Sequence, residues 1–246
     1  MQLDQPPSGL RGRFLDDPAL AGAENMARDE ALLECRIAPT LRFYSWAKPT
    51  LSLGYFQKAA DLPLDAVRAR GGEVVRRMTG GKAILHEHEL TYSLCMPESG
   101  ALAGGPAAAM EAIHRAIAGV LSQQANSEVT LRDDALLTSD QAGSAWCFED
   151  SSPLDLVLGG AKLLGSAARR RKGWVLFHGS LVLRVPIETP RIGALGGHPD
   201  LPKLKNAFSQ GLGLVFAPAV WSSAEMEMAA AFRKSRYECA EYLHLR

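Results

Sequence analysis

The sequence predicts an α+β fold, in which a mixed, largely antiparallel β-sheet forms the core and helices flank it. Three observations predict it. Strand-like runs occur in adjacent pairs, as at residues 41–46 and 51–55. Gly159 and Gly160 separate two further apolar runs, as in a two-residue hairpin turn. Helical patterns stand between such pairs, which is typical of α+β domains.

In the first part of the chain, residues 1–13 are predicted to be a loose polar arm, and residues 14–246 a single domain. Met26, Leu32 and Leu33 among polar neighbours predict an amphipathic helix over residues 21–36. The predicted elements that follow are strands at 41–46 and 51–55, a turn at Lys48 and Pro49, and a short helix at 64–70 that ends at Gly71 and Gly72.

In the second part, an apolar stripe at Ile113, Ile117, Val120 and Leu121 predicts a helix over residues 106–124. The next predicted elements are hairpin strands at 154–158 and 161–167 and a strand at 174–185, while residues 187–218 show no readable pattern. Ser222 and Glu225 form a capping-box pattern, which opens a last predicted helix reaching to about residue 242.

Composition and charge are ordinary for a globular protein. The 246 residues are 47% hydrophobic and 22% charged, which fits one large domain. The 27 basic and 27 acidic residues cancel, so net charge does not indicate a nucleic-acid partner. No apolar run approaches the roughly 18 residues of a membrane span, and the first residues lack the pattern of a secretory signal. We therefore expect a cytoplasmic protein that binds neither nucleic acid nor membrane.

The four cysteines, Cys35, Cys95, Cys147 and Cys239, are widely spaced and form no CxxC pair. This spacing argues against a zinc site and against a disulfide framework. We expect no metal, and a reducing compartment is the simplest setting.

Residues 74–94, VVRRMTGGKAILHEHELTYSL, contain the most informative motif. Two arginines precede a Thr79-Gly80-Gly81 turn, where glycine lets the backbone approach a ligand closely. Arginine offers planar, bidentate donors to carboxylate or phosphate groups. The short strands at 83–85 and 90–94 are predicted to form a hairpin. Taken alone, this motif describes a hairpin with charged flanks.

Two further residues are candidates for chemistry. Cys147 lies between two aromatic residues, after a polar loop at residues 133–143. A single cysteine in such a place is, by itself, typical of a small buried hydrophobe. Lys162 follows the glycine turn, where a lysine is typically a solvated side chain.

Together these motifs resemble those of the lipoate–protein ligase and octanoyltransferase superfamily. There an Arg-Arg-x-Ser/Thr-Gly-Gly loop leads into a strand that ends in histidine, and the essential lysine lies in a Gly-x-Lys-x-x-Gly setting, which residues 160–165 match. Residues 147–183 are most similar to the branch that transfers octanoyl groups through a cysteine. The resemblance covers residues 14–185, and we expect it to extend to the whole chain, because residues 41–57 also look like the family's second and third strands. It implies the biotin/lipoate protein ligase catalytic-domain fold.

The resemblance also implies roles for individual residues. Cys147 is the expected nucleophile, because a nearby ammonium such as that of Lys162 favours the thiolate. Lys162 would also stabilise the oxyanion of thioester attack, and it would shuttle a proton if burial lowered its pKa. The expected substrate-binding residues are Arg76, Arg77, Thr79, Gly80, Gly81, Lys82, His86, Gly165 and His178. A catalytic role for His86 or His178 is left open, since a histidine at a strand end commonly satisfies a neighbouring polar group.

The implied reaction moves octanoyl from octanoyl-acyl carrier protein to a lysine of a lipoyl domain, with the glycine cleavage H protein as the expected acceptor. An acyl-Cys147 thioester would be the intermediate, and no cofactor would be needed.

Three alternatives remain open. An ATP-dependent lipoate–protein ligase would use the same loop, but such ligases commonly carry an extra C-terminal domain, for which little room is expected after Val185. Their motif also tends to continue from histidine toward Gly-Asn, whereas this chain continues HEHELTY. An amidotransferase acting between lipoyl domains would also use a cysteine. A non-catalytic acyl- or carrier-binding module would not require Cys147 and Lys162 together.

The basic run Arg169-Arg170-Arg171-Lys172 has two interpretations. It is either a solvated turn or a surface that docks an acidic carrier, since local positive charge steers association even at zero net charge.

Overall fold

The computed structural model describes the chain except for residues 1–9, 100, 101, 103 and 188. Its larger sheet contains the strands β1 (Leu10–Leu20), β2 (Thr40–Trp46), β6 (Glu89–Pro97), β7 (Val129–Leu131), β8 (Leu156–Leu158), β9 (Ala161–Arg171), β10 (Trp174–Val182) and β11 (Leu214–Pro218). Within the described residues these eight strands are ordered β11-β1-β2-β6-β10-β9-β8-β7. A smaller sheet has the order β4-β3-β5, formed by β3 (Thr50–Leu53), β4 (Glu73–Arg76) and β5 (Ile84–His86).

The larger sheet is mixed and largely antiparallel, as predicted. β1 runs parallel to both β11 and β2, while the pairs from β2 to β7 are antiparallel. The predicted glycine turn joins β8 to β9, and both Gly159 (φ 60°) and Gly160 (φ 78°) have positive φ. Two positive φ values in succession are those of a type I′ turn, whose twist suits a hairpin.

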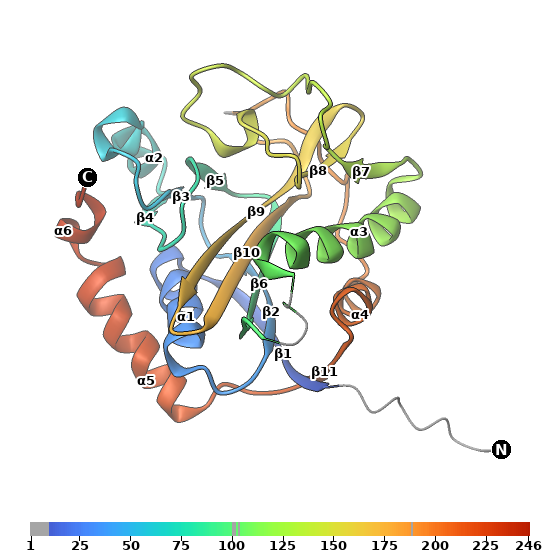
Figure 1. Cartoon of the computed structure of the whole chain (residues 1–246). Coiled ribbons are helices and arrows are strands. Elements are labelled where there is room, and N and C mark those ends of the chain that lie inside the picture. The colour runs from blue at the N-terminus through green and yellow to red at the C-terminus, as the bar shows by residue number, and fades with distance from the viewer. Residues whose placement is uncertain (1–9, 100–101, 103, 188) are drawn as a thin grey trace.

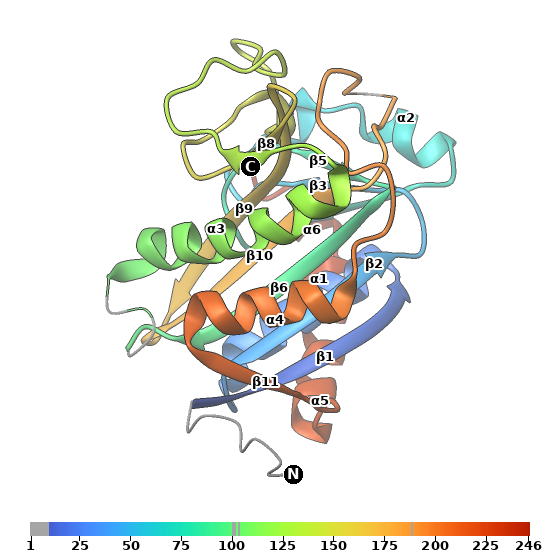
Figure 2. The ribbon, with the colours of Figure 1, turned by 90° about the vertical axis from the view of Figure 1, so that its right-hand side faces the viewer.

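Helices cover both faces of the larger sheet (Figures 1 and 2). The helices are α1 (Gly22–Cys35), α2 (Leu64–Ala69), α3 (Gly105–Ala125), α4 (Leu201–Leu212), α5 (Ser223–Phe232) and α6 (Ala240–Leu243). On one face, Ile113 and Ile117 of α3 and Phe208 of α4 pack against Phe43 and Phe177 of the sheet. On the other face, α1 packs between the sheet and α5. Among the described residues, no helix combines the length and apolar character needed to cross a bilayer.

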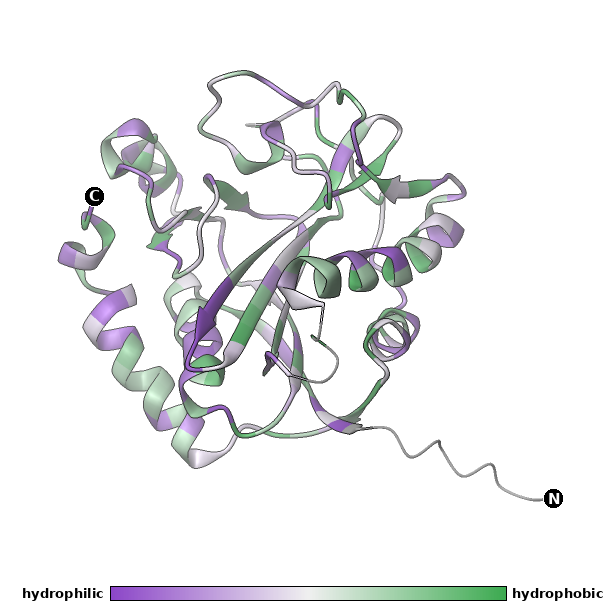
Figure 3. Ribbon diagram, viewed as in Figure 1, coloured by the Kyte–Doolittle hydropathy of each residue, from purple (hydrophilic) through white to green (hydrophobic). Residues whose placement is uncertain are grey.

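The hydropathy of the ribbon shows how β9 differs along its length (Figure 3). The first five residues of β9 are buried, whereas Arg170 is exposed at its far end. The neighbouring β10 is buried along almost its whole length. The buried half of this strand pair is therefore available to form the wall of a site.

Most predicted elements are confirmed, including the helices at 21–36, 64–70 and 106–124 and the strands at 41–46 and 51–55. The capping box of Ser222 and Glu225 is present at the start of α5. The last helix is not continuous, because the π-helical turn Arg233–Tyr237 separates α5 from α6. The region 187–218, for which no structure was predicted, contains α4 and β11.

Two predictions about strands were wrong. Residues 10–13, which were predicted to belong to a polar arm, are the start of β1, because they pair with β11 at residues 214–217; the rest of that predicted arm lies outside the described residues. The strands on either side of His86 do not form a hairpin. β5 pairs with β3 in the smaller sheet, whereas β6 lies between β2 and β10 in the larger one. The chain thus passes from one sheet to the other at residues 87 and 88.

Candidate active site

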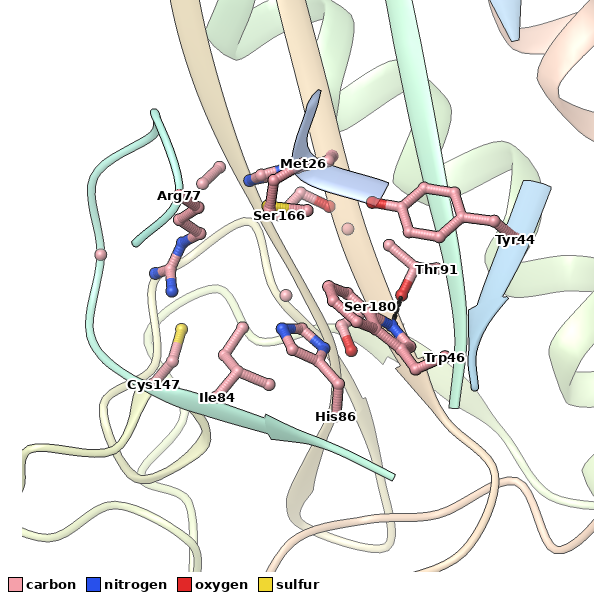
Figure 4. Close-up of a pocket in the computed structure, with 15 residues that line it drawn as sticks. Met26, Tyr44, Trp46, Arg77, Ile84, His86, Thr91, Cys147, Ser166 and Ser180 are labelled. Atoms are coloured by element: carbon pink, nitrogen blue, oxygen red, sulfur yellow. Dashed lines mark hydrogen bonds between the residues drawn. The ribbon is translucent and has the colours of Figure 1, made fainter. Parts of the chain in front are cut away.

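A pocket of about 70 Å³ lies between the larger sheet and the segment that contains the double-arginine motif (Figure 4). β9 and β10 form one wall through residues 165–167 and 178–180, and the opposite wall contains Arg77, Gly81 and Ile84. Trp46 and Tyr44 of β2 lie at one end and Cys147 at the other.

Cys147 begins a 3-10 turn, Cys147–Glu149, and is held against the residue that precedes β5. Its backbone N–H donates to Ala83 O (2.8 Å), and the N–H of Ala83 donates to Ala145 O (3.0 Å). The loop before Cys147 is fastened by the half-buried Ser144, whose hydroxyl donates to Glu149 Oε2 (2.6 Å). The sequence prediction thus identified the only cysteine that borders the pocket among the described residues.

Lys162, the second residue of β9, reaches Cys147 from beneath the pocket wall. Its side chain is 2% exposed, and Nζ lies 3.8 Å from Cys147 Sγ. Nζ also donates to Cys147 O (2.8 Å) and Asp150 O (3.3 Å) and forms an ion pair with Asp155 Oδ2 (2.8 Å). These three oxygens can accept all three ammonium hydrogens, and the sulfur lies close to the same positive charge.

The pKa of Lys162 contradicts the expectation of a proton shuttle. Burial alone would lower this pKa, but the neighbouring Cys147 and Asp155 outweigh burial, and the pKa lies above its ordinary value. The lysine therefore stays an ammonium at neutral pH. The predicted charge-stabilising role fits this geometry, and the predicted proton transfer through Lys162 does not.

Arg77 adds a second buried cation at the same end of the pocket. Figure 4 shows its guanidinium directed toward Cys147. It donates to three backbone carbonyls, those of Ser52 (3.0 Å), Gly80 (2.9 Å) and Lys82 (2.6 Å). Burial lowers the pKa of Arg77, and the Cys147 side chain opposes this shift.

The double-arginine segment approaches another part of the backbone closely at Gly81, opposite Gly54. Gly81 has φ +90°, and its carbonyl oxygen would lie 1.7 Å from a Cβ atom placed on Gly54. The two backbone segments are therefore in direct contact, and Gly81 borders the pocket. Gly80 makes no such tight contact.

Arg76 and Lys82, both predicted to bind substrate, do not line the pocket. Arg76 is 1% exposed and donates to backbone carbonyls, among them those of Leu243 (2.7 Å), Gly54 (3.0 Å) and Gln57 (2.7 Å). It therefore joins the double-arginine segment to the C-terminal helix. Lys82 forms an ion pair with Asp150 (3.0 Å), three residues after Cys147.

His178 borders the pocket and is held from both ring nitrogens. Nε2 lies 2.6 Å from the hydroxyl of Thr79, and Nδ1 lies 3.3 Å from Asp29 Oδ2. Burial lowers the pKa of His178, although Asp29 opposes the shift, so the ring is neutral at neutral pH. Burial would raise the pKa of Asp29, but its contacts with His178 and Arg42 outweigh burial and lower it.

His86 has a comparable setting on β5. Nε2 lies 2.7 Å from Ser52 Oγ, Nδ1 is hydrogen-bonded to Glu89, and the ring stacks on Trp46 with a centroid distance of 3.9 Å. Among the predicted site residues, the structure thus brings Cys147, Arg77, Gly81, His86, Gly165 and His178 to one pocket. Lys162 and Thr79 lie directly behind its wall.

Several site residues were missed in the sequence. Asp155 was not singled out, although a lysine that is buried in a hairpin requires a carboxylate partner. Asp29 lies on the same face of α1 as the buried Met26 and Leu33, and an acidic residue on an apolar helix face is a usable signal. Trp46 and Ile84 carry no such signal, because both fit ordinary apolar strands.

The basic run is largely neutralised by the chain's own acidic residues. Arg170 pairs with Glu98, Arg171 with Glu34 (3.0 Å) and with Glu30, and Lys172 with Glu34 (3.3 Å). Arg169 lies over the ring of Tyr55, 5.3 Å from its centroid. The docking role stays a prediction, and Arg169 is the member of the run that has no ion pair among the described residues.

Comparisons with known proteins agree on one family. A family model for the lipoyl protein ligase A/B catalytic domain matches residues 21–191. The Octanoyltransferase LipM of Lysinibacillus sphaericus (strain C3-41) is 33% identical over 269 residues, which cover 93% of this chain and 97% of that protein.

Two solved structures show that the fold is shared with lipoate ligases. Protein Ta0514 of T. acidophilum, described as a lipoate protein ligase, has a TM-score of 0.77 at 20% identity and covers 96% of this chain and 100% of its own. A lipoate-protein ligase A bound with ATP has a TM-score of 0.76 at 22% identity and covers 96% of this chain and 99% of its own. The predicted lipoate-ligase type of fold is thereby confirmed.

Proposed function

The chain belongs to the lipoyl protein ligase A/B catalytic-domain family, and on this premise we propose that it is an octanoyltransferase of lipoate biosynthesis that carries the octanoyl group on Cys147. Its relatives over nearly the whole chain are octanoyltransferases, and the enzyme is an acyltransferase. The cysteine mechanism, the donor and the acceptor are parts of the proposal.

The observation that carries the proposal is the pairing of Cys147 with Lys162. A thiol that borders a largely apolar pocket lies 3.8 Å from an ammonium that burial does not neutralise. Such a cation favours the thiolate over the thiol, and the thiolate is the nucleophilic form. The guanidinium of Arg77 adds positive charge on the pocket side (Figure 4).

In the first half-reaction, the Cys147 thiolate attacks the carbonyl carbon of an octanoyl thioester. The new bond joins Sγ to the carbonyl carbon, and the bond to the donor sulfur breaks. The donor leaves as a thiolate, which takes up the proton that Cys147 lost. The fixed ammonium of Lys162 would stabilise the negative charge that passes through the tetrahedral intermediate.

In the second half-reaction, the neutral amine of an acceptor lysine attacks the acyl-Cys147 carbonyl. An amide bond forms, the bond to Sγ breaks, and the proton lost by the amine balances the thiolate regenerated on Cys147. Because the energy of the thioester is conserved in the intermediate, neither step requires ATP.

We propose octanoyl-acyl carrier protein as the donor and a lipoyl domain, such as the glycine cleavage H protein, as the acceptor. The octanoyltransferase relatives support the octanoyl group. A structural neighbour described together with its E2 lipoyl domain supports this class of acceptor.

Intact-protein mass spectrometry tests the proposal. The protein is incubated with octanoyl-acyl carrier protein in the absence of ATP, and an octanoyl adduct is expected on the peptide that contains Cys147. Cys147→Ala should give no adduct, whereas Cys239→Ala, at a half-buried site outside the pocket, should label as wild type does. An adduct that survives in Cys147→Ala would refute the mechanism. An adduct that forms from octanoylated H protein but not from the carrier would indicate an amidotransferase.

A further inference from the structure

A second, much smaller cavity, of about 10 Å³, lies behind the loop that carries Cys147. Trp146 and Phe148, the residues on either side of Cys147, both line it, together with apolar side chains that include Val182 and Ile192. Cys147 itself borders the first pocket. The turn at Cys147 therefore lies between two cavities.

A single side chain separates these cavities. Among the described residues, Ile84 alone borders both of them. It directly follows Ala83, whose carbonyl accepts the backbone N–H of Cys147 (2.8 Å). Figure 4 shows the Ile84 side chain beside Cys147 and directed into the pocket. The Ile84 side chain, which we call the partition, thus lies at the Cys147 end of the pocket. The first carbons of an acyl chain bound to Cys147 as a thioester would lie there.

We propose that Ile84 restricts this enzyme to acyl chains that are unbranched next to the carbonyl, and that the cavity behind Ile84 is a latent subsite for such a branch. The proposal rests on the proposed acyl transfer through Cys147. A straight chain leaves Sγ along the pocket toward Trp46. A chain with an ethyl group on the carbon next to the carbonyl would have to place that group where Ile84 stands. A steric clash of this kind weakens binding by about tenfold or more.

The other end of the pocket offers an internal control. Trp46, not Ile84, separates the pocket there from a third cavity, lined by residues such as His88, Arg184 and His198. Removing the Ile84 side chain would leave that end unchanged. The proposal therefore separates tolerance of branching, which should change, from tolerance of chain length, which should not.

The test compares Ile84→Ala with wild type on carrier protein loaded with octanoyl, with 2-ethylhexanoyl or with decanoyl groups. Octanoyl and 2-ethylhexanoyl are isomers, so they differ in shape and not in carbon number. The ratio of kcat/KM for the branched donor to that for the octanoyl donor should rise about tenfold or more in Ile84→Ala, because only discrimination between donors enters this ratio. The decanoyl-to-octanoyl ratio should not change.

Ile192→Ala is the matched control. Ile192 is buried and lines only the second cavity, so its removal enlarges that cavity but leaves the partition in place. Its branched-to-linear ratio should equal that of wild type. An unchanged ratio in Ile84→Ala, or an equal gain in Ile192→Ala, would overturn the proposal. A general loss of packing would lower kcat/KM for all three donors by the same factor. That result too would contradict a role of Ile84 in selecting between donors.

A second measurement keeps the partition testable if the transfer mechanism fails. Octanoate and 2-ethylhexanoate are tested as protectors of Cys147 against alkylation by iodoacetamide, read by peptide mass spectrometry. Wild type should be protected by octanoate alone, and Ile84→Ala by both acids. If the carrier leaves no adduct on wild type but this pattern holds, the proposed function is wrong and the partition is right. If both acids protect wild type equally, the partition is wrong.

Discussion

A Cβ atom on Gly165 would lie 2.7 Å from Cε and 2.9 Å from Nζ of Lys162. The lysine side chain occupies the space that any larger residue at 165 would need. In a regular strand, residues three apart face opposite sides. Here Leu156 pairs with Leu164 but Val157 pairs with Lys162, so β9 has one extra residue and the alternation is reset. This bulge places Lys162 and Gly165 together and turns the amine toward Cys147.

Gly165→Ala should therefore displace the ammonium from Cys147. A shift of about 1 Å at a catalytic group can reduce the rate about 10²-fold, and we expect a loss of this size in kcat. Gly119→Ala is the control, because Gly119 is exposed in α3 with open space around it. It should leave the rate unchanged and stabilise the helix by roughly 0.5–1 kcal/mol. Steady-state kinetics and denaturant unfolding measure the two effects, and normal activity in Gly165→Ala would contradict this account of the motif.

Lys162→Ala should reduce transfer by roughly 10²–10³-fold, the usual scale for removing one charge stabiliser. Lys162→Arg should restore little, because a planar guanidinium cannot match three separate acceptors around one nitrogen. Either change also disturbs the buried Asp155, so stability must be measured as well. Lys162→Met combined with Asp155→Asn removes both charges; it should recover stability relative to Lys162→Ala but not recover activity. Recovery of both would show that the lysine serves folding alone.

Acyl transfer should be independent of ATP. When free octanoate, ATP and an acceptor domain are supplied, no pyrophosphate should be released, because the thioester already supplies the activation. A lipoate–protein ligase assayed in parallel provides the positive control. ATP-dependent modification of the domain with free octanoate or lipoate would favour the ligase alternative.

Stability should fall as the pH drops below about 6.5, the ordinary value for histidine. Burial lowers the pKa of His178 and of His114 in the folded protein, so in this window the unfolded chain binds more protons. The stability gained by keeping these two rings neutral is therefore fully present above the pKa that they have in the unfolded chain. It is lost as the pH falls through the lower pKa that they have in the folded protein. Denaturant midpoints from pH 5 to 8 should show a shallower decline in His178→Gln than in wild type, while exposed His198→Gln should follow wild type. An identical slope in His178→Gln would contradict this reading of the buried ring.

The sequence predicted those elements whose signals are local. Capping of α5 depends on Ser222 and Glu225 alone, and the hairpin at Gly159 and Gly160 depends on the turn itself. β1 and β11 escaped prediction because each is completed by strands remote in the sequence, and Pro18 with two aspartates obscures the alternation of β1. The division of β5 and β6 between two sheets is likewise decided by their partners.

The site was predictable to the extent that motifs describe it. The pairing of Cys147 with Lys162 was inferred from the resemblance, and their contact fits that inference. The orientation of Arg76 was not predictable, because a motif does not distinguish an arginine that faces a ligand from one that is bonded to backbone carbonyls. The direction of the Lys162 pKa also required the structure, since it depends on Asp155 and Cys147 outweighing burial.

The contact between Arg76 and the carbonyl of Leu243 spans 167 positions of the chain. It has a consequence for the order in which parts of the protein fold. When the double-arginine segment leaves the ribosome, the carbonyls of Gly54 and Gln57 have already been made, but that of Leu243 has not. Because a buried N–H group that lacks an acceptor is unfavourable, the side of the guanidinium that donates to Leu243 is expected to stay hydrated until residue 243 has emerged. The double-arginine segment is therefore expected to be fully enclosed late in folding, after Cys147 and the described strands of both sheets have been made.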